Sequence, residues 1–158
     1  MIVVTKCPAT LSLDEQNEIK AKLKLESSQE LYFSFVDYAE LVYSDDKTMK
    51  VSEIRNVDKL LLAGIAKPNP FFAYLHSEND EILVFPDHHH FTENDINDIK
   101  NKSQNKIIIT TEKDFVRLKD SIPSRQLYYL PIRSSFLSAS DNFDKTITNY
   151  VGTSTRNS

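Results

Sequence analysis

An aspartate followed by three histidines, Asp87-His88-His89-His90, is the segment of this sequence best suited to chemistry. It comes directly after a short apolar run at residues 82–85, which is typical of a β-strand. Histidine changes its charge nearest neutral pH, and a neighbouring carboxylate can fix its tautomer or raise its basicity. The pair Asp87 and His88 is therefore a candidate acid/base or metal-binding unit, with an exposed polar loop as the alternative.

Polar side chains also follow other predicted strands. These residues are Thr5, Lys6, the segment 64–68 that begins with Gly64, and Thr111, Glu112, Lys113 and Asp114. Right-handed crossovers in a parallel sheet would bring all of these strand ends to one edge, where ligands bind in open α/β folds. Lys6 could offer a charge to an anion, or it could lie in a solvated turn. Helix capping alone explains Thr111 and Asp114, whereas Lys113 opposes the helix dipole and so needs another reason for its position.

The overall composition indicates a compact globular protein rather than a disordered or membrane-spanning one. The chain has 158 residues, of which 40% are hydrophobic and 27% charged, and its formal net charge is −4. This charge and the absence of a Lys/Arg block argue against nucleic-acid or anionic-lipid binding. No apolar run approaches the roughly 20 residues of a membrane span, and the N-terminus lacks a signal-peptide pattern. The single cysteine, Cys7, excludes an internal disulfide and fits a cytoplasmic protein, as a packing residue rather than a nucleophile.

Glycine is unusually scarce, with only Gly64 and Gly152 present. Average usage would give about eleven in a chain of this length. The phosphate-binding patterns G-x-x-x-x-G-K-[ST] and G-x-G-x-x-G are both absent, so the chain cannot build a nucleotide phosphate site of either kind. Gly64 is either required by the backbone or marks a place where a ligand approaches the backbone closely.

Alternation of strand-like and helix-like segments predicts the fold class. Strands are expected at residues 2–4, 31–36, 59–64, 82–85, 106–110 and 127–131, with a short edge strand at 39–43. Helices are expected after the capping boxes at Ser12 and Thr92, after a proline ahead of Phe71, after Thr111, and through Phe143 and Ile147. We therefore predict one three-layer α/β/α domain over residues 1–151 with a mainly parallel sheet, and a frayed tail at 152–158.

An ordered series of short motifs resembles the C-terminal part of the tetraacyldisaccharide 4'-kinase family. The series runs through Val3-Val4-Thr5-Lys6-Cys7-Pro8, Ala63-Gly64-Ile65-Ala66-Lys67-Pro68, Phe85-Pro86-Asp87-His88-His89, Phe91-Thr92, Ile109-Thr110-Thr111-Glu112-Lys113-Asp114 and Leu130-Pro131-Ile132. The resemblance covers nearly the whole chain in order, and it is the series rather than any one motif that is specific. It implies a Rossmann-like C-terminal lobe of a P-loop kinase.

The resemblance further implies a lipid A biosynthesis enzyme that transfers the γ-phosphoryl group of ATP, with Mg²⁺, to the 4'-hydroxyl of tetraacyldisaccharide 1-phosphate. The implied partner is an N-terminal P-loop lobe, absent here, which carries the Mg²⁺-binding acids and the surface that contacts the cytoplasmic face of the inner membrane. By the same resemblance, Asp87 and His88 are catalytic, and His88 works with an aspartate of that lobe. The strand-end residues Thr5, Lys6 and 111–114 would line the nucleotide side of the cleft.

Two other functions compete with this interpretation. A metal-dependent phosphoesterase could use Asp87, His88 and His89, although successive loop histidines rarely face one ion and the aspartate-rich motifs of DHH phosphoesterases are missing. A noncatalytic, receiver-like module is disfavoured because the first strand ends in Thr5-Lys6 rather than in an acidic pair. Because the chain enters a strand at Ile2, we expect a piece of a longer protein. Because it lacks the P-loop pattern and has only two glycines, we expect it to fold but to lack kinase activity and to bind ATP weakly.

Overall fold

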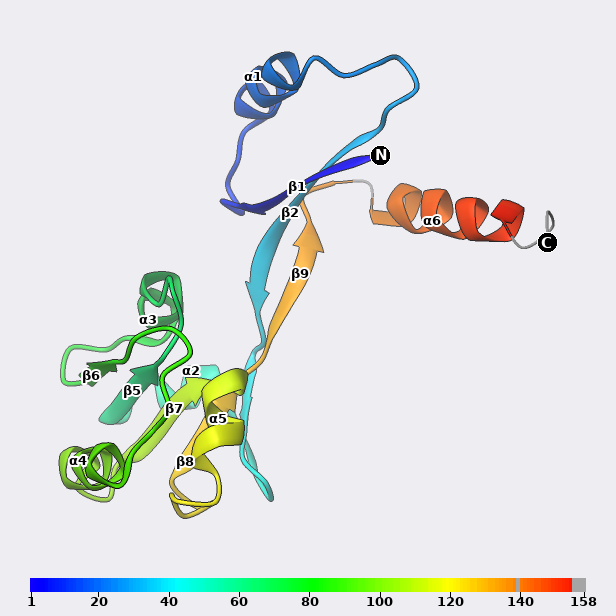
Figure 1. Cartoon of the computed structure of the whole chain (residues 1–158). Coiled ribbons are helices and arrows are strands. Elements are labelled where there is room, and N and C mark those ends of the chain that lie inside the picture. The colour runs from blue at the N-terminus through cyan, green and yellow to red at the C-terminus, as the bar shows by residue number, and fades with distance from the viewer. Residues whose placement is uncertain (139, 155–158) are drawn as a thin grey trace. The chain divides into compact units, whose positions relative to one another are not determined.

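The computed structural model describes residues 1–138 and 140–154 and divides the chain into two compact units (Figure 1). Unit 1 combines Met1–Asp37 with Arg133–Ser158, and unit 2 is Tyr38–Ile132. The sequence led us to expect one domain over residues 1–151, whereas the packing groups the residues into these two units. In the part of the chain that the structure describes, no helix is long and apolar enough to cross a membrane.

Unit 2 is built on a six-stranded sheet with the strand order β4-β3-β8-β7-β5-β6. Its strands are β3 (Leu41–Tyr43), β4 (Thr48–Lys50), β5 (Lys59–Ala63), β6 (Glu81–Val84), β7 (Ile107–Thr111) and β8 (Leu127–Leu130). The pairs β5–β6, β5–β7 and β7–β8 are parallel, and β3 is antiparallel to both β4 and β8. The predicted mainly parallel sheet is therefore confirmed in this unit, with an antiparallel hairpin added at one edge.

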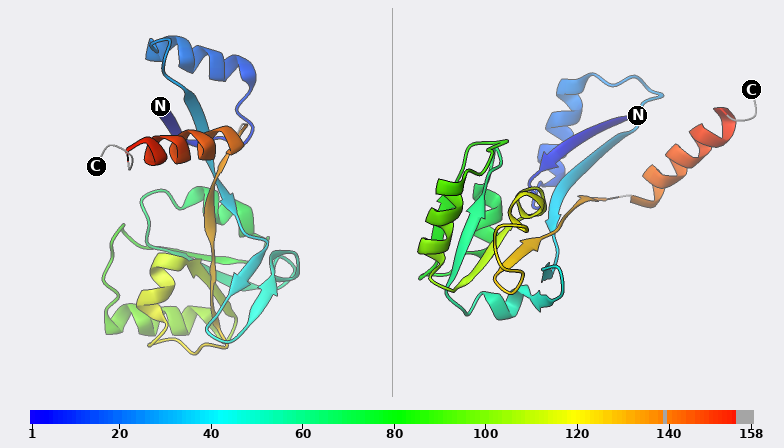
Figure 2. Two further views of the ribbon diagram at one scale, coloured as in Figure 1. Left: turned by 90° about the vertical axis from the view of Figure 1, so that its right-hand side faces the viewer. Right: turned by 60° about the horizontal axis from the view of Figure 1, so that its bottom comes forward.

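Alternating side chains of the parallel strands are buried in two separate cores, one on each face of the sheet. Figure 2 shows the helices of this unit on both sides of its sheet. On one face, Leu61 and Ile109 pack with α2 (Val51–Ile54) and α3 (Asn69–Leu75). On the other face, Leu62 and Ile108 pack with residues of α4 (Glu93–Ser103) and α5 (Glu112–Leu118). This is the three-layer α/β/α arrangement that the sequence predicted.

Strand β5 lies between these two layers, and all five of its residues are buried. Its first residue, Lys59, is a charged side chain with no solvent exposure, and its Nζ lies 2.8 Å from Oδ2 of the equally buried Asp80. Lys59 also donates to the Ser77 hydroxyl, and the Ser77 backbone N–H donates to Asp80. The pair is thus hydrogen-bonded on both sides, as a buried ion pair must be if it is not to destabilise the fold.

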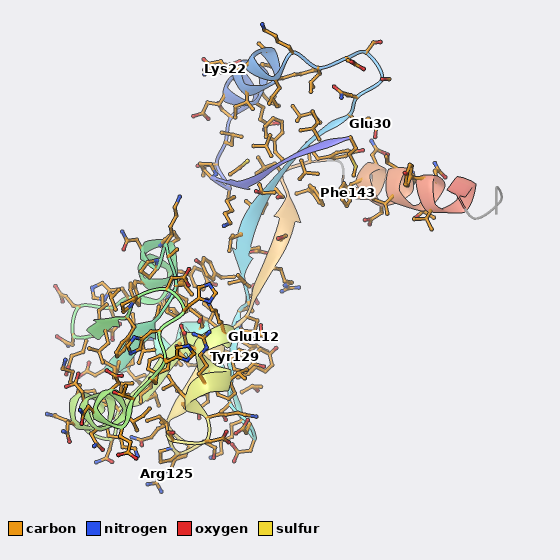
Figure 3. All side chains as sticks on the ribbon, in the orientation of Figure 1. Lys22, Glu30, Glu112, Arg125, Tyr129 and Phe143 are labelled. Atoms are coloured by element: carbon orange, nitrogen blue, oxygen red, sulfur yellow. The ribbon has the colours of Figure 1, made fainter. Side chains whose placement is uncertain are left out.

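Unit 1 contains a three-stranded sheet in the order β1-β2-β9, formed by β1 (Ile2–Cys7), β2 (Leu31–Tyr38) and β9 (Ile132–Phe136). Its helices are α1 (Leu13–Leu23), whose Ser12–Glu15 capping box is as predicted, and α6 (Ser140–Ser154). Phe143 of α6 makes edge-to-face contact with Tyr32, at 5.2 Å between ring centroids. Phe143 and Glu30, labelled in Figure 3, both belong to this unit.

Four details differ from the sequence-based expectations. Strand β1 pairs in parallel with β2 in its own sheet and is not part of the sheet of unit 2. The strands β4 and β9 were not predicted, and residues 127–131 are not the last strand. Helix α6 continues to Ser154, so the tail predicted to fray from residue 152 is helical at its start. Residues 155–158 of that tail lie outside the described residues.

Candidate functional site

The candidate site is a tight turn at the carboxyl end of β6. The backbone N–H of His89 donates to the carbonyl of Pro86 at 3.2 Å, which closes the turn over Asp87 and His88. His88 has a φ of 61°, in the left-handed region that side-chain-bearing residues rarely adopt. Its side chain is 75% exposed, so the turn presents the imidazole to its surroundings.

Asp87 is held as an ionised carboxylate between two partners. The Lys113 ammonium donates to its Oδ1 at 2.9 Å, and the backbone N–H of His88 donates to the same atom at 3.0 Å. The His88 Nε2 atom lies 3.7 Å from Oδ2 of Asp87. The hydrogen bond from Lys113 is the main cause that lowers the pKa of Asp87, with the charges of His88 and Lys113 acting in the same direction. An ionised Asp87 can orient the neighbouring imidazole of His88.

His89 has a different environment from His88, because its ring is packed into the fold. Its Nε2 lies 3.0 Å from Oδ2 of Asp95, and its ring stacks on Phe85 at 4.9 Å between centroids. The Phe91 ring makes an edge-to-face contact with the His89 ring, at 5.3 Å between ring centroids. Asp95 also belongs to the capping box of α4, because its carboxylate accepts from the N–H and hydroxyl of Thr92. His89 therefore anchors the turn to α4, while His90 is exposed.

Asp114, on α5, ties two strand ends together from within the fold. Its side chain is completely buried, and its Oδ2 accepts from the Gly64 N–H at 2.8 Å and from the Thr111 hydroxyl at 2.7 Å. A Cβ added to Gly64 would lie 3.1 Å from Oδ1 of Asp114 and 3.4 Å from the Pro86 carbonyl oxygen. A side chain at Gly64 would therefore press on these neighbours, although Gly64 itself has no positive φ, so close packing and not a special backbone conformation distinguishes this position.

Arg117, one turn further along α5, reaches the histidine turn as well. Its Nη1 atom donates to the carbonyl oxygen of His89 at 3.3 Å and lies 3.8 Å from Oδ1 of Asp114. Within the described part of the chain, this Oδ1 atom accepts no hydrogen bond. Arg117 is not among the site residues predicted from the sequence, because a contact to a backbone carbonyl leaves no pattern in the sequence.

The structure brings some of the predicted site residues together and separates others. Asp87, His88, Lys113 and Asp114 lie at the carboxyl edge of the sheet of unit 2, with Thr111 at the end of β7. Glu112, labelled in Figure 3, is the exposed first residue of α5.

The expectation that Thr5 and Lys6 share this edge is wrong, because β1 belongs to the sheet of unit 1. Both residues are exposed there. They lie where the pairing of β1 with β2 shifts register between Val4 and Cys7, and Lys6 has a φ of 58°. Lys6 thus lies at an irregularity within the strand and not in the solvated turn that was one alternative for it.

A metal-dependent phosphoesterase finds no support in this arrangement. Among the described residues, no group of three or more His, Cys, Asp and Glu side chains is placed to hold a metal ion. His89, the third ligand in that hypothesis, instead directs its Nε2 to Asp95.

The sequence matches the profile of the family described as tetraacyldisaccharide-1-P 4'-kinase over residues 1–152. This chain belongs to the tetraacyldisaccharide-1-P 4'-kinase family. The resemblance inferred from the ordered motifs is thereby confirmed. Asp87, His88 and the α5 residues all fall inside the matched region, as do Thr5 and Lys6.

Curated relatives in this family match the chain along nearly its whole length. A tetraacyldisaccharide 4'-kinase from Flavobacterium johnsoniae is 54% identical over 151 residues, which cover 96% of this chain and 44% of that protein. The same enzyme from Flavobacterium psychrophilum is 55% identical over 159 residues, covering 99% and 46%. The one from Bacteroides thetaiotaomicron is 37% identical over 181 residues, covering 100% and 48%. The chain thus spans less than half the length of these relatives.

One solved structure has a similar fold. It is a crystal structure of LpxK from Aquifex aeolicus in complex with ATP, and it matches with a TM-score of 0.54 and 17% sequence identity. The match covers 80% of this chain and 38% of that chain. At this level of identity the comparison supports the α/β fold and carries no residue assignments.

Proposed function

We propose that this chain is the His88-bearing part of an ATP-dependent kinase that phosphorylates the 4'-hydroxyl of tetraacyldisaccharide 1-phosphate in lipid A biosynthesis. The observation that carries the proposal is the turn after β6, which presents an exposed His88 imidazole beside an ionised Asp87. Family membership over residues 1–152 supplies the reaction class.

In this proposal, His88 accepts the proton of the sugar hydroxyl as the hydroxyl oxygen bonds to the γ-phosphorus of ATP, while the bond from that phosphorus to the bridging oxygen breaks and ADP leaves. Asp87 keeps the imidazole oriented and stabilises the imidazolium that results. Lys113 keeps Asp87 ionised and in place. Phosphoryl transfer depends mainly on positioning and on neutralising charge, so a single well-placed base is a useful contribution from this part of the protein.

The residues of this chain do not fit a complete site for ATP and Mg²⁺. The chain has two glycines and no P-loop pattern, and the described side chains form no cluster of metal ligands. The proposal therefore assigns the nucleotide phosphates and Mg²⁺ to an N-terminal P-loop lobe of the same protein. That lobe also makes the peripheral contact with the cytoplasmic face of the inner membrane.

The remaining predicted site residues take secondary roles in the proposal. Glu112 is exposed in unit 2 and stays a candidate for contacts on the nucleotide side. Thr5 and Lys6 are exposed in unit 1 and are a separate candidate for such contacts. Thr111 and Asp114 are hydrogen-bonded to one another, and Asp114 is buried, so these two support the site from inside.

A chimera tests this function. The region of the Flavobacterium johnsoniae kinase that matches this chain is replaced by the chain, and transfer of labelled phosphate from ATP to tetraacyldisaccharide 1-phosphate is measured. We expect the chimera to be active and His88→Ala to lower kcat by at least about 100-fold, the usual contribution of a general base. His90→Ala removes an exposed neighbouring imidazole and serves as the matched control, with activity unchanged. A folded chimera that is inactive, or one that tolerates His88→Ala, would contradict the proposal.

A further inference from the structure

His88 occupies the second of the two central positions in the turn that the His89 N–H and the Pro86 carbonyl close. Its φ of 61° is disfavoured for residues with a side chain, and its imidazole is 75% exposed. A conformation of this kind persists only where the surrounding structure imposes it. The groups that hold the turn must therefore act on its neighbours, Asp87 and His89.

Helix α5 supplies one cation to each of these neighbours. Lys113 donates to the carboxylate of Asp87 at 2.9 Å, and Arg117 donates to the carbonyl of His89 at 3.3 Å. The two cations are four residues apart, so they project from the same face of the helix. Together they hold the turn immediately before and immediately after His88.

The Arg117 contact is also connected to the sheet. The Arg117 guanidinium lies 3.8 Å from the carboxylate of Asp114, which itself accepts from the backbone N–H of Gly64 at the end of β5. Because Asp114 is completely buried and bonded to the strand ends, it fixes the direction in which Arg117 can extend. The position of the His88 turn is thereby set relative to β5 and β7.

We propose that Arg117 is a positioning residue, which holds the turn after β6 so that His88 stands in its working conformation. The inference rests on the proposed function of His88 for its effect on catalysis. Its structural part, the dependence of the His88 backbone on Arg117, does not need that function. Arg117 contacts the carbonyl of His89 and not the reacting groups.

The test compares three single variants, Arg117→Gln, Arg117→Lys and Lys119→Gln. Lys119 is the exposed C-cap residue of the same helix. Lys119→Gln therefore also removes one positive charge, but at a position outside the His88 turn. In the chimera we expect Arg117→Gln to lower kcat about tenfold or more with KM changed less than about twofold, because a small displacement of a catalytic group is costly. Arg117→Lys restores part of the activity, and Lys119→Gln behaves like the parent.

A second readout is independent of activity. In the 158-residue chain, Arg117→Gln is expected to shift and broaden the backbone amide resonance of His88, while the resonances of buried β5 residues and the melting temperature stay close to those of the parent. Full activity in Arg117→Gln, with an unchanged His88 resonance, would overturn the inference while leaving the proposed function intact. If the unaltered chimera is inactive, the proposed function fails. An unchanged His88 resonance in Arg117→Gln would then by itself reject the positioning role of Arg117.

Discussion

At the scale of single residues, the three consecutive histidines 88–90 lie in different environments. His88 is exposed beside Asp87, His89 is packed against Phe85 and paired with Asp95, and His90 is exposed. The backbone of one turn thus places three identical side chains in three different environments. Only the first of them is both accessible and next to a carboxylate held by a cation, which is why we propose a chemical role for His88 and not for the other two.

Asp95 provides a direct check on this description. Its pKa is lowered from 3.8 to about 2, first by the backbone N–H of Thr92, then by the Thr92 hydroxyl and by His89. We expect a ¹³C titration of the Asp95 carboxyl to show this low value. In Thr92→Val the pKa rises only part of the way towards 3.8, because the backbone N–H remains.

The same lowered pKa fixes the sign of the pH dependence. A carboxyl whose folded-state pKa is below its unfolded value stabilises the fold above the unfolded pKa, and this contribution is lost as the pH falls through the folded value. The contribution of Asp95 is therefore complete above about pH 4 and disappears towards pH 2. Urea denaturation between these values should show a shallower loss of stability in Thr92→Val than in the parent. An Asp95 that titrates near 4 in the parent chain would contradict the capping geometry.

Some of these residue-level features were predictable from the sequence and others were not. The pair Asp87-His88 stands next to a strand-like apolar run, and the capping box at Thr92 has its own local pattern. The contact of Arg117 with the His89 carbonyl joins residues 28 apart and uses a backbone acceptor. Local sequence contains no information on such a contact, since every residue offers the same carbonyl.

At the scale of elements, the buried pair Lys59–Asp80 secures the start of β5 to the loop before β6. Replacing Asp80 by Asn leaves the fully buried Lys59 ammonium without its counter-charge. We expect Asp80→Asn to lower the free energy of unfolding by about 3–5 kcal/mol, as measured by urea denaturation.

Two further variants separate the charge effect from a general loss of packing. Asp120→Asn, at an exposed position, should leave stability nearly unchanged. The double variant Lys59→Met with Asp80→Leu removes both charges, and we expect it to be less destabilised than Asp80→Asn. If Asp80→Asn is as stable as the Asp120→Asn control, the pair does not have the role assigned to it.

The elements were predicted wherever the sequence carries a strong local pattern. Apolar runs located β5 and β7, and capping boxes located the starts of α1 and α4. Strand β4 has three residues, and most of β9 is exposed, so neither shows an apolar run or a clear alternation. Strands of this kind are defined by the partners with which they pair, which the local sequence does not reveal.

At the scale of the whole molecule, the placement of β1 was the least predictable feature. Its apolar run, Ile2 to Val4, fits any buried parallel strand, and chain order suggested that it joins the sheet of β5. The structure pairs it with β2 and places β2 next to β9, from the other end of the chain. Which strands share a sheet depends on contacts distant in sequence, so the pattern of one strand cannot decide it.

The division of labour in the proposed kinase leads to a prediction for this chain alone. Because it has no P-loop pattern and only two glycines, we expect the 158-residue chain to fold without phosphorylating tetraacyldisaccharide 1-phosphate and to bind ATP only weakly. Circular dichroism checks folding, titration calorimetry measures ATP binding, and the transfer assay is run beside the active chimera. Phosphorylation by the isolated chain would show that the nucleotide site lies within these residues.

Strand β5 has both of its faces committed, with Leu60 and Leu62 in one core and Leu61 and Ala63 in the other. Side chains alternate strictly along a strand, so one inserted or deleted residue would exchange the two sets and send each into a space shaped for the other. Such a change would also move Gly64 away from the buried Asp114 carboxylate, which accepts a hydrogen bond from the Gly64 N–H. A change of length within β5 would therefore disrupt both cores and the position of the strand end that leads to Gly64.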